Sequence, residues 1–245
     1  MRSRPRLLTT LGALLGACIC ACTGTDVAES KQEEAMRLLA QGRQQIAEMK
    51  LREAIVSLRM VLHRDSSNVD AIAGLAEVYR IQQRVGAADG YLRKVIFESY
   101  SEGMRLLEAN EEAAAIKVFK HAVELHPAHT LALIELGKLA TKSGGDSAAV
   151  AYFELAREAN PLYAQGRIIL GEAYLAGGRY GDARKEFEQA LQINANGFGA
   201  HVGLAHALAG EKLWPEAVRQ FEKALLLNPA SEDAKSGLQR VRRQM

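Results

Sequence analysis

The chain repeats itself at intervals of 34 residues, and this period constrains the fold more than any other feature. An alanine that follows an acidic or small residue recurs at Ala54, Ala88, Ala115, Ala149, Ala183 and Ala217. The successive spacings are 34, 27, 34, 34 and 34 residues. A repeat of this length is one supersecondary unit that cannot bury its apolar face alone, so the units must stack on one another.

Each unit carries the pattern of two amphipathic helices. Four positions after the recurring alanine come Leu58, Leu92, Phe119, Phe153, Phe187 and Phe221, and three positions further on come Val61, Val95, Ala122, Ala156, Ala190 and Ala224. Offsets of four and three place these residues on one face of a helix. A second apolar face lies upstream, as at Leu136-Gly137 with Ala140. The pattern therefore predicts a helical hairpin in each unit.

The composition supports an all-α fold and argues against other classes of protein. Aromatic residues make up only 6% of the 245 residues, whereas β-sandwiches and barrels favour aromatic and β-branched side chains. Hydrophobic residues make up 48%, which argues against a disordered chain. The formal net charge of +2 is too small to indicate a nucleic-acid-binding protein.

This 34-residue pattern resembles the tetratricopeptide repeat (TPR). Three prolines close units at equivalent positions, Pro127, Pro161 and Pro229. Gly144-Gly145 and Gly177-Gly178 suit the turn between the helices of a unit, where a left-handed residue is needed. The resemblance covers residues 35–231 and implies an all-α, right-handed superhelical solenoid. We expect six repeats and a polar capping helix, at 35–68, 69–95, 96–129, 130–163, 164–197, 198–231 and 232–245.

The 27-residue spacing departs from the repeat, because seven residues are missing between Val95 and the start of the third unit. No proline or glycine interrupts the stretch from Tyr91 to Ser101. We therefore expect the second helix of unit two to continue into the first helix of unit three, over residues 88–109. The alternative is a shortened helix followed by a tight turn near Phe97 to Ser101.

The N-terminus is typical of a bacterial secretory signal. Three arginines in the first six residues precede an apolar run from Leu7 to Leu15, which is too short to span a bilayer. The segment Leu15-Gly16-Ala17-Cys18 resembles the lipobox, which implies that Cys18 is lipidated. We expect a signal peptide at 1–17 and a lipidated N-terminus with a short linker at 18–34.

Other readings of this segment remain open. Ile19-Cys20-Ala21-Cys22 also resembles a lipobox and makes Cys22 the alternative lipidation site, and ordinary cleavage after Ala17 or Ala21 would leave no lipid. All three cysteines lie here, so no disulfide links the repeats. With Ile19 or Thr23 after the lipidated cysteine, the family resemblance implies the periplasmic face of the outer membrane.

The sequence offers no recognisable catalytic, cofactor-binding or metal-ligating set. His121, His126 and His129 lie close together, but only Glu124 shares a face with His121, and two ligands fall short of a metal site. Capping or solvent-facing histidines are the simpler interpretation. We therefore expect a protein that is not an enzyme and that binds no cofactor, metal or nucleic acid.

The TPR resemblance implies a concave groove lined by the first helix of each unit. We expect nine residues there to contact a partner: Tyr100, Met104, Leu131, Ile134, Lys138, Ile168, Glu172, Val202 and His206. Some TPR co-chaperones bind a carboxylate through a lysine and an asparagine at two positions of the repeat. In unit one of this chain those positions hold Leu39 and Arg43. That clamp is therefore not carried over, and the groove suits an extended or helical peptide with apolar anchors.

The overall layout is similar to the pilotin-type lipoproteins of type IV pilus assembly. This resemblance implies a non-catalytic, membrane-tethered adaptor that binds a peptide segment, a secretin or an export subunit. The alternative is an accessory lipoprotein of exopolysaccharide or cell-wall biosynthesis and export. A cytosolic co-chaperone would require an uncleaved N-terminus.

Overall fold

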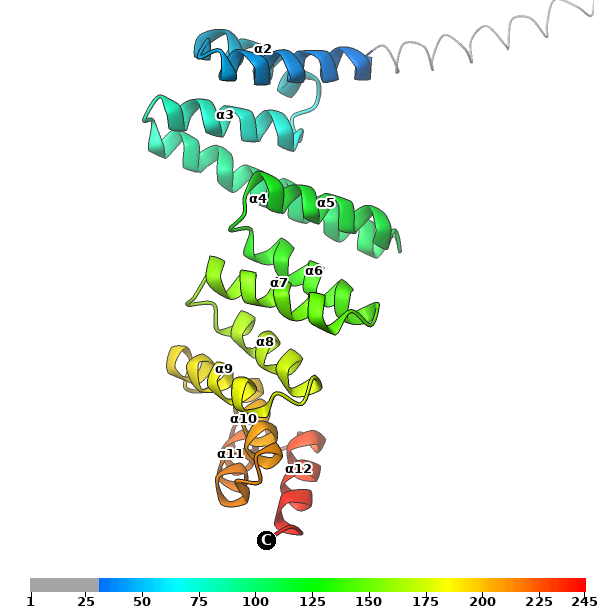
Figure 1. Cartoon of the computed structure of the whole chain (residues 1–245), viewed down its shortest axis with the longest axis vertical. Coiled ribbons are helices and arrows are strands. Elements are labelled where there is room, and N and C mark those ends of the chain that lie inside the picture. The colour runs from blue at the N-terminus through cyan, green and yellow to red at the C-terminus, as the bar shows by residue number, and fades with distance from the viewer. Residues whose placement is uncertain (1–30) are drawn as a thin grey trace, which may run out of the picture. The chain divides into compact units, whose positions relative to one another are not determined.

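The computed structural model describes residues 31–245 (Figure 1). The predicted signal peptide at 1–17, both lipidation sites, Cys18 and Cys22, and most of the linker at 18–34 lie outside the described residues. Within 31–245 all regular secondary structure is helical, which confirms the all-α fold. The chain divides into two compact units, one ending at Val95 and the other running from Ile96 to Met245.

The first unit is built from four helical segments. These are a helix at 31–47, α2 (Leu51–Arg64), α3 (Val69–Ile81) and the beginning of α4 (Val85–Glu108). Leu58 of α2 is fully buried in the core of this unit. A Cβ atom at Gly42 or Gly74 would lie 2.8 or 2.9 Å from the Leu58 side chain. The two glycines therefore let the neighbouring helices close around this leucine.

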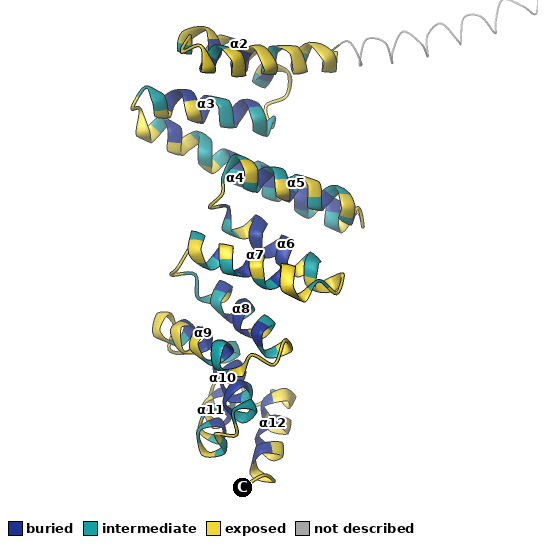
Figure 2. Cartoon of the chain, viewed as in Figure 1, coloured by how far each residue is buried: buried dark blue, intermediate teal, exposed yellow. Residues whose placement is uncertain are grey.

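The second unit contains the remainder of α4 and a series of helical hairpins. Its further helices are α5 (Glu112–Leu125), α6 (Thr130–Lys142), α7 (Asp146–Ala159), α8 (Ala164–Ala176), α9 (Tyr180–Ile193), α10 (Phe198–Gly210), α11 (Trp214–Leu227) and α12 (Glu232–Arg242). From α5 to α12 each helix packs against the next one, and α10 also contacts α8 and α12. Buried and exposed residues alternate along the helices, as amphipathic packing requires (Figure 2).

One helix spans the shortened interval of the sequence. α4 runs for 24 residues without a break, so the alternative of a tight turn near Phe97 to Ser101 is wrong. The segment from Tyr91 to Ser101 contains no proline or glycine that would stop a helix, and this is the physical reason for its continuity. The division between the two compact units falls inside α4, after Val95.

Phenylalanine and glycine residues set the spacing between helices in the second unit. Phe119, Phe153 and Phe187 are almost fully buried. A Cβ atom at Gly137 would lie 2.3 Å from the ring of Phe153, and a Cβ at Gly203 would lie 2.3 Å from the ring of Phe187. Each ring thus occupies the space that a side chain on the neighbouring helix would need. The small residues of the repeat pattern are required by this packing.

Every turn between the two helices of a hairpin contains a residue with positive φ. These residues are Met49, Gln83, Asn110, Gly144, Gly178 and Lys212. The left-handed turns expected at the two glycine pairs are therefore present, at Gly144 and Gly178. The other four turns place a residue with a Cβ atom in the same backbone conformation, which is disfavoured for such residues.

Candidate functional site

Three of the predicted groove residues in the second unit are exposed to solvent. Leu131 and Lys138 lie on α6, and Glu172 lies on α8. The exposed fraction of Leu131 is 38%. The amino group of Lys138 donates to Glu135 Oε1 at 2.8 Å, so part of its charge is neutralised within one helical turn. These residues offer one apolar, one basic and one acidic side chain.

Glu172 is exposed on α8, and desolvation by the surrounding protein raises the pKa of its carboxyl group above the usual value.

Three other predicted groove residues are buried between helices. Ile134 is 3% exposed, Ile168 is 9% exposed and Val202 is 8% exposed. Ile134 packs in a cluster with Leu133 and Ala156, whereas Ile168 and Val202 belong to the main core of the second unit. Their places in the repeat point toward the adjacent helix, so little of their surface remains for a partner. Contact of these residues with a partner stays a prediction.

Tyr100 and Met104 of α4 are half-buried against the helical hairpin that follows. Both pack on the apolar cluster around Phe119, and the ring centroids of Tyr100 and Phe119 are 6.3 Å apart. Burial, followed by the nearby Glu135 carboxylate, raises the pKa of the Tyr100 phenol. These two residues support the packing of α4 and leave only part of each side chain accessible.

His206, the last predicted groove residue, is held by the capping helix. Its Nε2 atom lies 3.3 Å from Asp233 Oδ1, and its Nδ1 atom lies 3.4 Å from an Nη2 atom of Arg240. The ring also meets Phe221 edge to face, with centroids 5.0 Å apart. α12 therefore fixes the orientation of this imidazole.

A cavity of about 540 Å³ opens beside His206. We call it the C-terminal cavity, and its lining consists of Leu175, Ala176, Tyr180, His206, Ala209, Gly210, Trp214, Arg240, Val241 and Gln244. The groove pattern predicted His206 in this set. It did not predict a binding role for Tyr180, Trp214 or Arg240, since these come from the starts of α9 and α11 and from the capping helix. The only sequence signal was that Trp214 is the single tryptophan of the chain.

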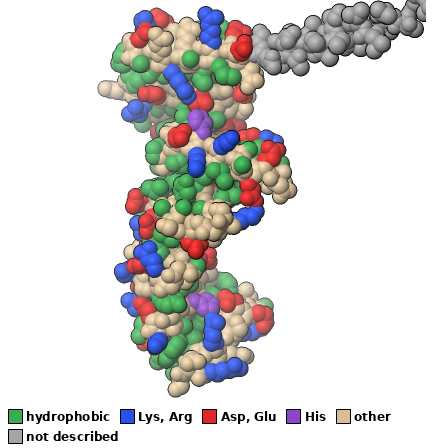
Figure 3. Space-filling model, turned by 45° about the vertical axis from the view of Figure 1, so that its right-hand side comes forward, with side chains coloured by type: hydrophobic (Ala, Val, Ile, Leu, Met, Phe, Trp, Pro, Cys, Tyr) green, Lys and Arg blue, Asp and Glu red, His purple; other side chains and the backbone are tan. Residues whose placement is uncertain are grey.

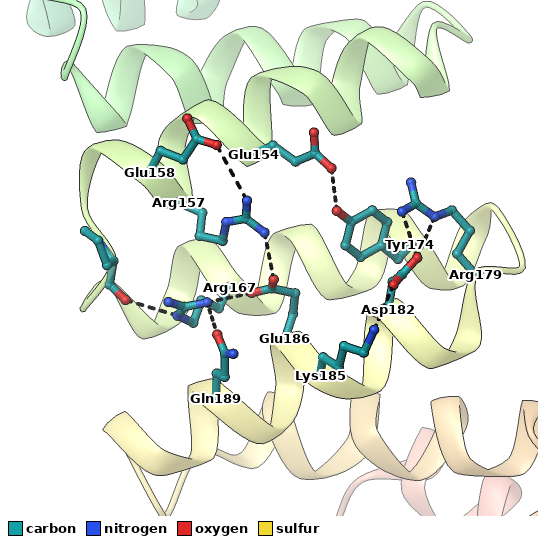
Figure 4. Close-up of polar contacts among 11 residues, drawn as sticks. Glu154, Arg157, Glu158, Arg167, Tyr174, Arg179, Asp182, Lys185, Glu186 and Gln189 are labelled. Carbon is teal, nitrogen blue, oxygen red and sulfur yellow. Dashed lines mark hydrogen bonds and ion pairs between the residues drawn. The ribbon is translucent and has the colours of Figure 1, made fainter.

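A polar network connects α7, α8 and α9 (Figure 4). Glu186 is only 6% exposed and accepts hydrogen bonds from Arg157 at 3.0 Å and from Arg167 at 2.8 Å. Arg167 also donates through Nε to the carbonyl oxygen of Pro161 at 3.0 Å. A buried carboxylate needs such partners to remain charged. The network fixes the positions of three helices.

Tyr174 extends this network without offering an acid–base group. Its hydroxyl donates to Glu154 Oε1 at 2.5 Å, and the Arg179 guanidinium carbon lies 4.2 Å from the ring centroid (Figure 4). Burial and the Glu154 carboxylate raise the pKa of the phenol to about 12. The hydroxyl therefore stays protonated at neutral pH and acts as a hydrogen-bond donor.

The three histidines that lie close together in sequence differ in their surroundings. The Nδ1 atom of His121, on α5, lies 3.5 Å from Glu124 Oε2. His129 is buried with its Nε2 atom 3.2 Å from the carbonyl oxygen of Ile96, and its backbone N–H donates to the carbonyl oxygen of His126 at 2.9 Å. No group of three or more potential metal ligands gathers among residues 31–245.

The surface carries charges of both signs. On the face drawn in Figure 3, acidic and basic side chains are interspersed with hydrophobic ones. Most ion pairs are exposed, such as Arg179 with Asp182 at 2.7 Å, and pairs of this kind contribute little to stability. None of the helices within 31–245 combines the length and the apolar character needed to cross a membrane.

Solved structures of other proteins share this fold. The chain is similar to Pseudomonas aeruginosa pilF, with 19% identity over 88% of this chain and 100% of that one and a TM-score of 0.51. It is also similar to YrrB, a TPR protein with an unusual peptide-binding site, with 17% identity over 88% of this chain and 97% of that one and a TM-score of 0.50. A third match is the Cut9–Hcn1 hetero-tetramer of the APC/C, with 21% identity over 89% of this chain, 44% of that chain and a TM-score of 0.53. At these identities the likeness shows the fold alone.

The sequence itself matches family models but no curated protein. No curated sequence matches the chain significantly. Two models described as tetratricopeptide repeat match residues 100–164, 142–198 and 174–241. Together these matches extend from residue 100 to residue 241, which is more than half of the 245 residues. The helical hairpins, the glycine–phenylalanine packing and these matches agree, and the chain belongs to the tetratricopeptide repeat family.

Proposed function

We propose that this protein is a non-catalytic, membrane-tethered adaptor that binds a protein partner and assists the assembly of an envelope machine such as a type IV pilus or its secretin. The repeat fold is that of a protein–protein interaction scaffold. The observation that carries the binding role is the set of solvent-exposed side chains on the first helices of the hairpins, Leu131, Lys138 and Glu172. An exposed apolar residue together with side chains of both charges suits a peptide segment with apolar anchors.

The tether and the choice of system rest on the sequence. The lipobox-like segment ending at Cys18 supports a lipid anchor, and several acyl chains hold a protein at a membrane stably. Confinement of adaptor and partner to one surface raises their effective concentration. The fold shared with Pseudomonas aeruginosa pilF is compatible with a role in pili, and the similar layout of signal, linker and repeats motivates that part of the proposal.

Site-specific crosslinking in the native envelope tests the partner-binding surface. A photo-crosslinking residue placed at Leu131 or at Glu172 should capture an outer-membrane pore or export subunit. The same residue at Leu226, which is 82% exposed on the second helix α11, is the matched control and should capture far less. Equal capture from all three positions would contradict the assignment of the surface.

Removal of one charge provides the functional counterpart of that experiment. Lys138→Gln removes the positive charge of an exposed residue but keeps a polar N–H donor beside Glu135, so it should lower partner capture while leaving the helical circular dichroism unchanged. Charges at Ile134 or Ile168 are unsuitable for this purpose because both residues are buried and the variants would unfold. Mass spectrometry of the mature N-terminus decides separately whether Cys18 or Cys22 carries lipid. An unlipidated, uncleaved N-terminus would refute the tether.

A further inference from the structure

The C-terminal cavity is formed where several helices end or begin. Leu175, Ala209 and Arg240 lie in the last turns of α8, α10 and α12, and Tyr180 and Trp214 are the first residues of α9 and α11. Its volume of about 540 Å³ falls within the range of pockets that bind small ligands. The cavity therefore offers room for a group from another molecule.

The interior of the cavity is apolar and aromatic. Leu175 and Val241 contribute aliphatic surface, and Tyr180 and Trp214 contribute rings. A Cβ atom at Gly210 would lie 2.3 Å from the ring of Tyr180, so the glycine makes room for this ring in the wall. Such a lining favours a bulky apolar side chain, because its burial removes apolar surface from water.

Arg240 is the residue of this lining that carries a permanent positive charge. Its Nη2 atom lies 3.4 Å from His206 Nδ1, and no ion pair joins it to an acidic side chain within residues 31–245. His206 Nε2 lies 3.3 Å from Asp233 Oδ1, so the imidazole contacts Asp233 and Arg240 through different ring nitrogens. The positive charge of Arg240 therefore remains available for an anion at the edge of the cavity.

We propose that the C-terminal cavity binds a partner polypeptide segment in which a bulky apolar side chain is followed by an acidic residue that pairs with Arg240. This proposal rests on the adaptor function proposed above and identifies the chemistry that the adaptor recognises. Arg240 belongs to the same lining as the apolar residues, so the apolar group and the carboxylate are carried by residues close together in the segment.

The single tryptophan of the chain supplies a direct readout, because Trp214 lines the cavity. The probe is a peptide with blocked termini that carries phenylalanine followed by glutamate and contains no tryptophan. Titration into the full-length protein should change the Trp214 emission and reach saturation. Replacing the phenylalanine of the peptide with alanine should weaken binding more than tenfold, since most of the buried apolar area is lost. Replacing its glutamate with glutamine should weaken binding about fivefold, as expected for an exposed ion pair.

Protein variants assign these effects to the cavity. Arg240→Gln should weaken binding of the glutamate peptide about fivefold and leave the glutamine peptide unaffected. Arg243→Gln removes the same charge from an exposed position outside the lining, next to the end of α12, and is the matched control. Ala176→Phe enlarges an exposed residue of the lining and should abolish saturable binding of both peptides. Circular dichroism identifies any variant that fails to fold.

Several outcomes would overturn the proposal. One is equal affinity for the glutamate and glutamine peptides, and another is unchanged binding by Ala176→Phe. Tighter binding of a peptide that ends in phenylalanine with a free carboxylate would show that a chain terminus is the occupant instead. If Ala176→Phe still captures the envelope partner as the unaltered protein does, the cavity assignment fails while the adaptor function stands. If no envelope partner is captured by either protein, the adaptor function itself fails.

Discussion

At the scale of single residues, the contact between Phe187 and the glycines facing it decides how closely the hairpins approach. A methyl group at Gly203 would lie 2.3 Å from the Phe187 ring, so Gly203→Ala forces the ring or the helix to move. We expect the free energy of unfolding to fall by about 1–3 kcal/mol. Urea denaturation measures this change. Gly90→Ala, in open space within α4, is the control and should raise stability by about 0.5–1 kcal/mol.

The turn residues with positive φ give a second prediction at this scale. Gln83 has a φ of 58°, a conformation that glycine adopts without the steric cost of a Cβ atom. Gln83→Gly should therefore raise the free energy of unfolding by about 0.5–1 kcal/mol. The neighbouring Gln82 has a φ of −74°, so Gln82→Gly should lower it instead. Effects of the same sign in the two variants would refute this account of the turn.

At the scale of elements, His129 connects α4 to the start of α6. It is 1% exposed, its Nδ1 atom accepts from the backbone N–H of Ala132 at 3.3 Å, and its Nε2 atom lies 3.1 Å from Ser99 Oγ. Burial lowers the pKa of this imidazole, and burial also lowers the pKa of nearby His126. The neutral ring thus caps one helix and contacts another.

This lowered pKa predicts that the fold loses stability in mild acid. Below pH ~6.5 the unfolded chain binds protons that the folded His129 does not, so the free energy of unfolding falls as the pH drops. The slope for one histidine is at most about 1.4 kcal/mol per pH unit. Urea denaturation at pH 7.5 and 5.5 measures it.

An asparagine in place of His129 separates the cap from the titration. His129→Asn keeps a side-chain acceptor for the start of α6 but cannot be protonated in this range. Its loss of stability between pH 7.5 and 5.5 should be smaller than that of the unaltered protein by about 1 kcal/mol. Identical losses would mean that His129 does not contribute to the pH dependence.

At the scale of the whole molecule, the repeat period predicted the fold because each unit uses the same local pattern. The helical period alone was enough to place the recurring alanine and phenylalanine residues on one face of a helix. The absence of proline and glycine between Tyr91 and Ser101 favoured a continuous helix there. The exposure of the groove residues was harder to predict. Ile134 and Ile168 occupy groove places in the repeat, yet both are buried in apolar clusters between helices.

The C-terminal cavity could not be predicted from the sequence for a related reason. Its lining combines residues from Leu175 to Gln244, and only the packing of α8, α10 and α12 brings them together. Arg240 lies in the last turn of α12, where a cation compensates the helix dipole, so its place in the sequence needs no ligand to explain it. The repeat pattern describes each unit separately, so it does not predict the contact between the last unit and the capping helix.

The position of α12 has a consequence for association between molecules. A Cβ atom at Gly237 would lie 2.4 Å from the ring of Phe221, so α12 occupies the place that the opening helix of a seventh unit would take. Its opposite side exposes Lys235, Gln239 and Arg242. A second molecule that approached this side of α12 would therefore meet charged and amide groups, which disfavours the apolar stacking that joins one repeat to the next.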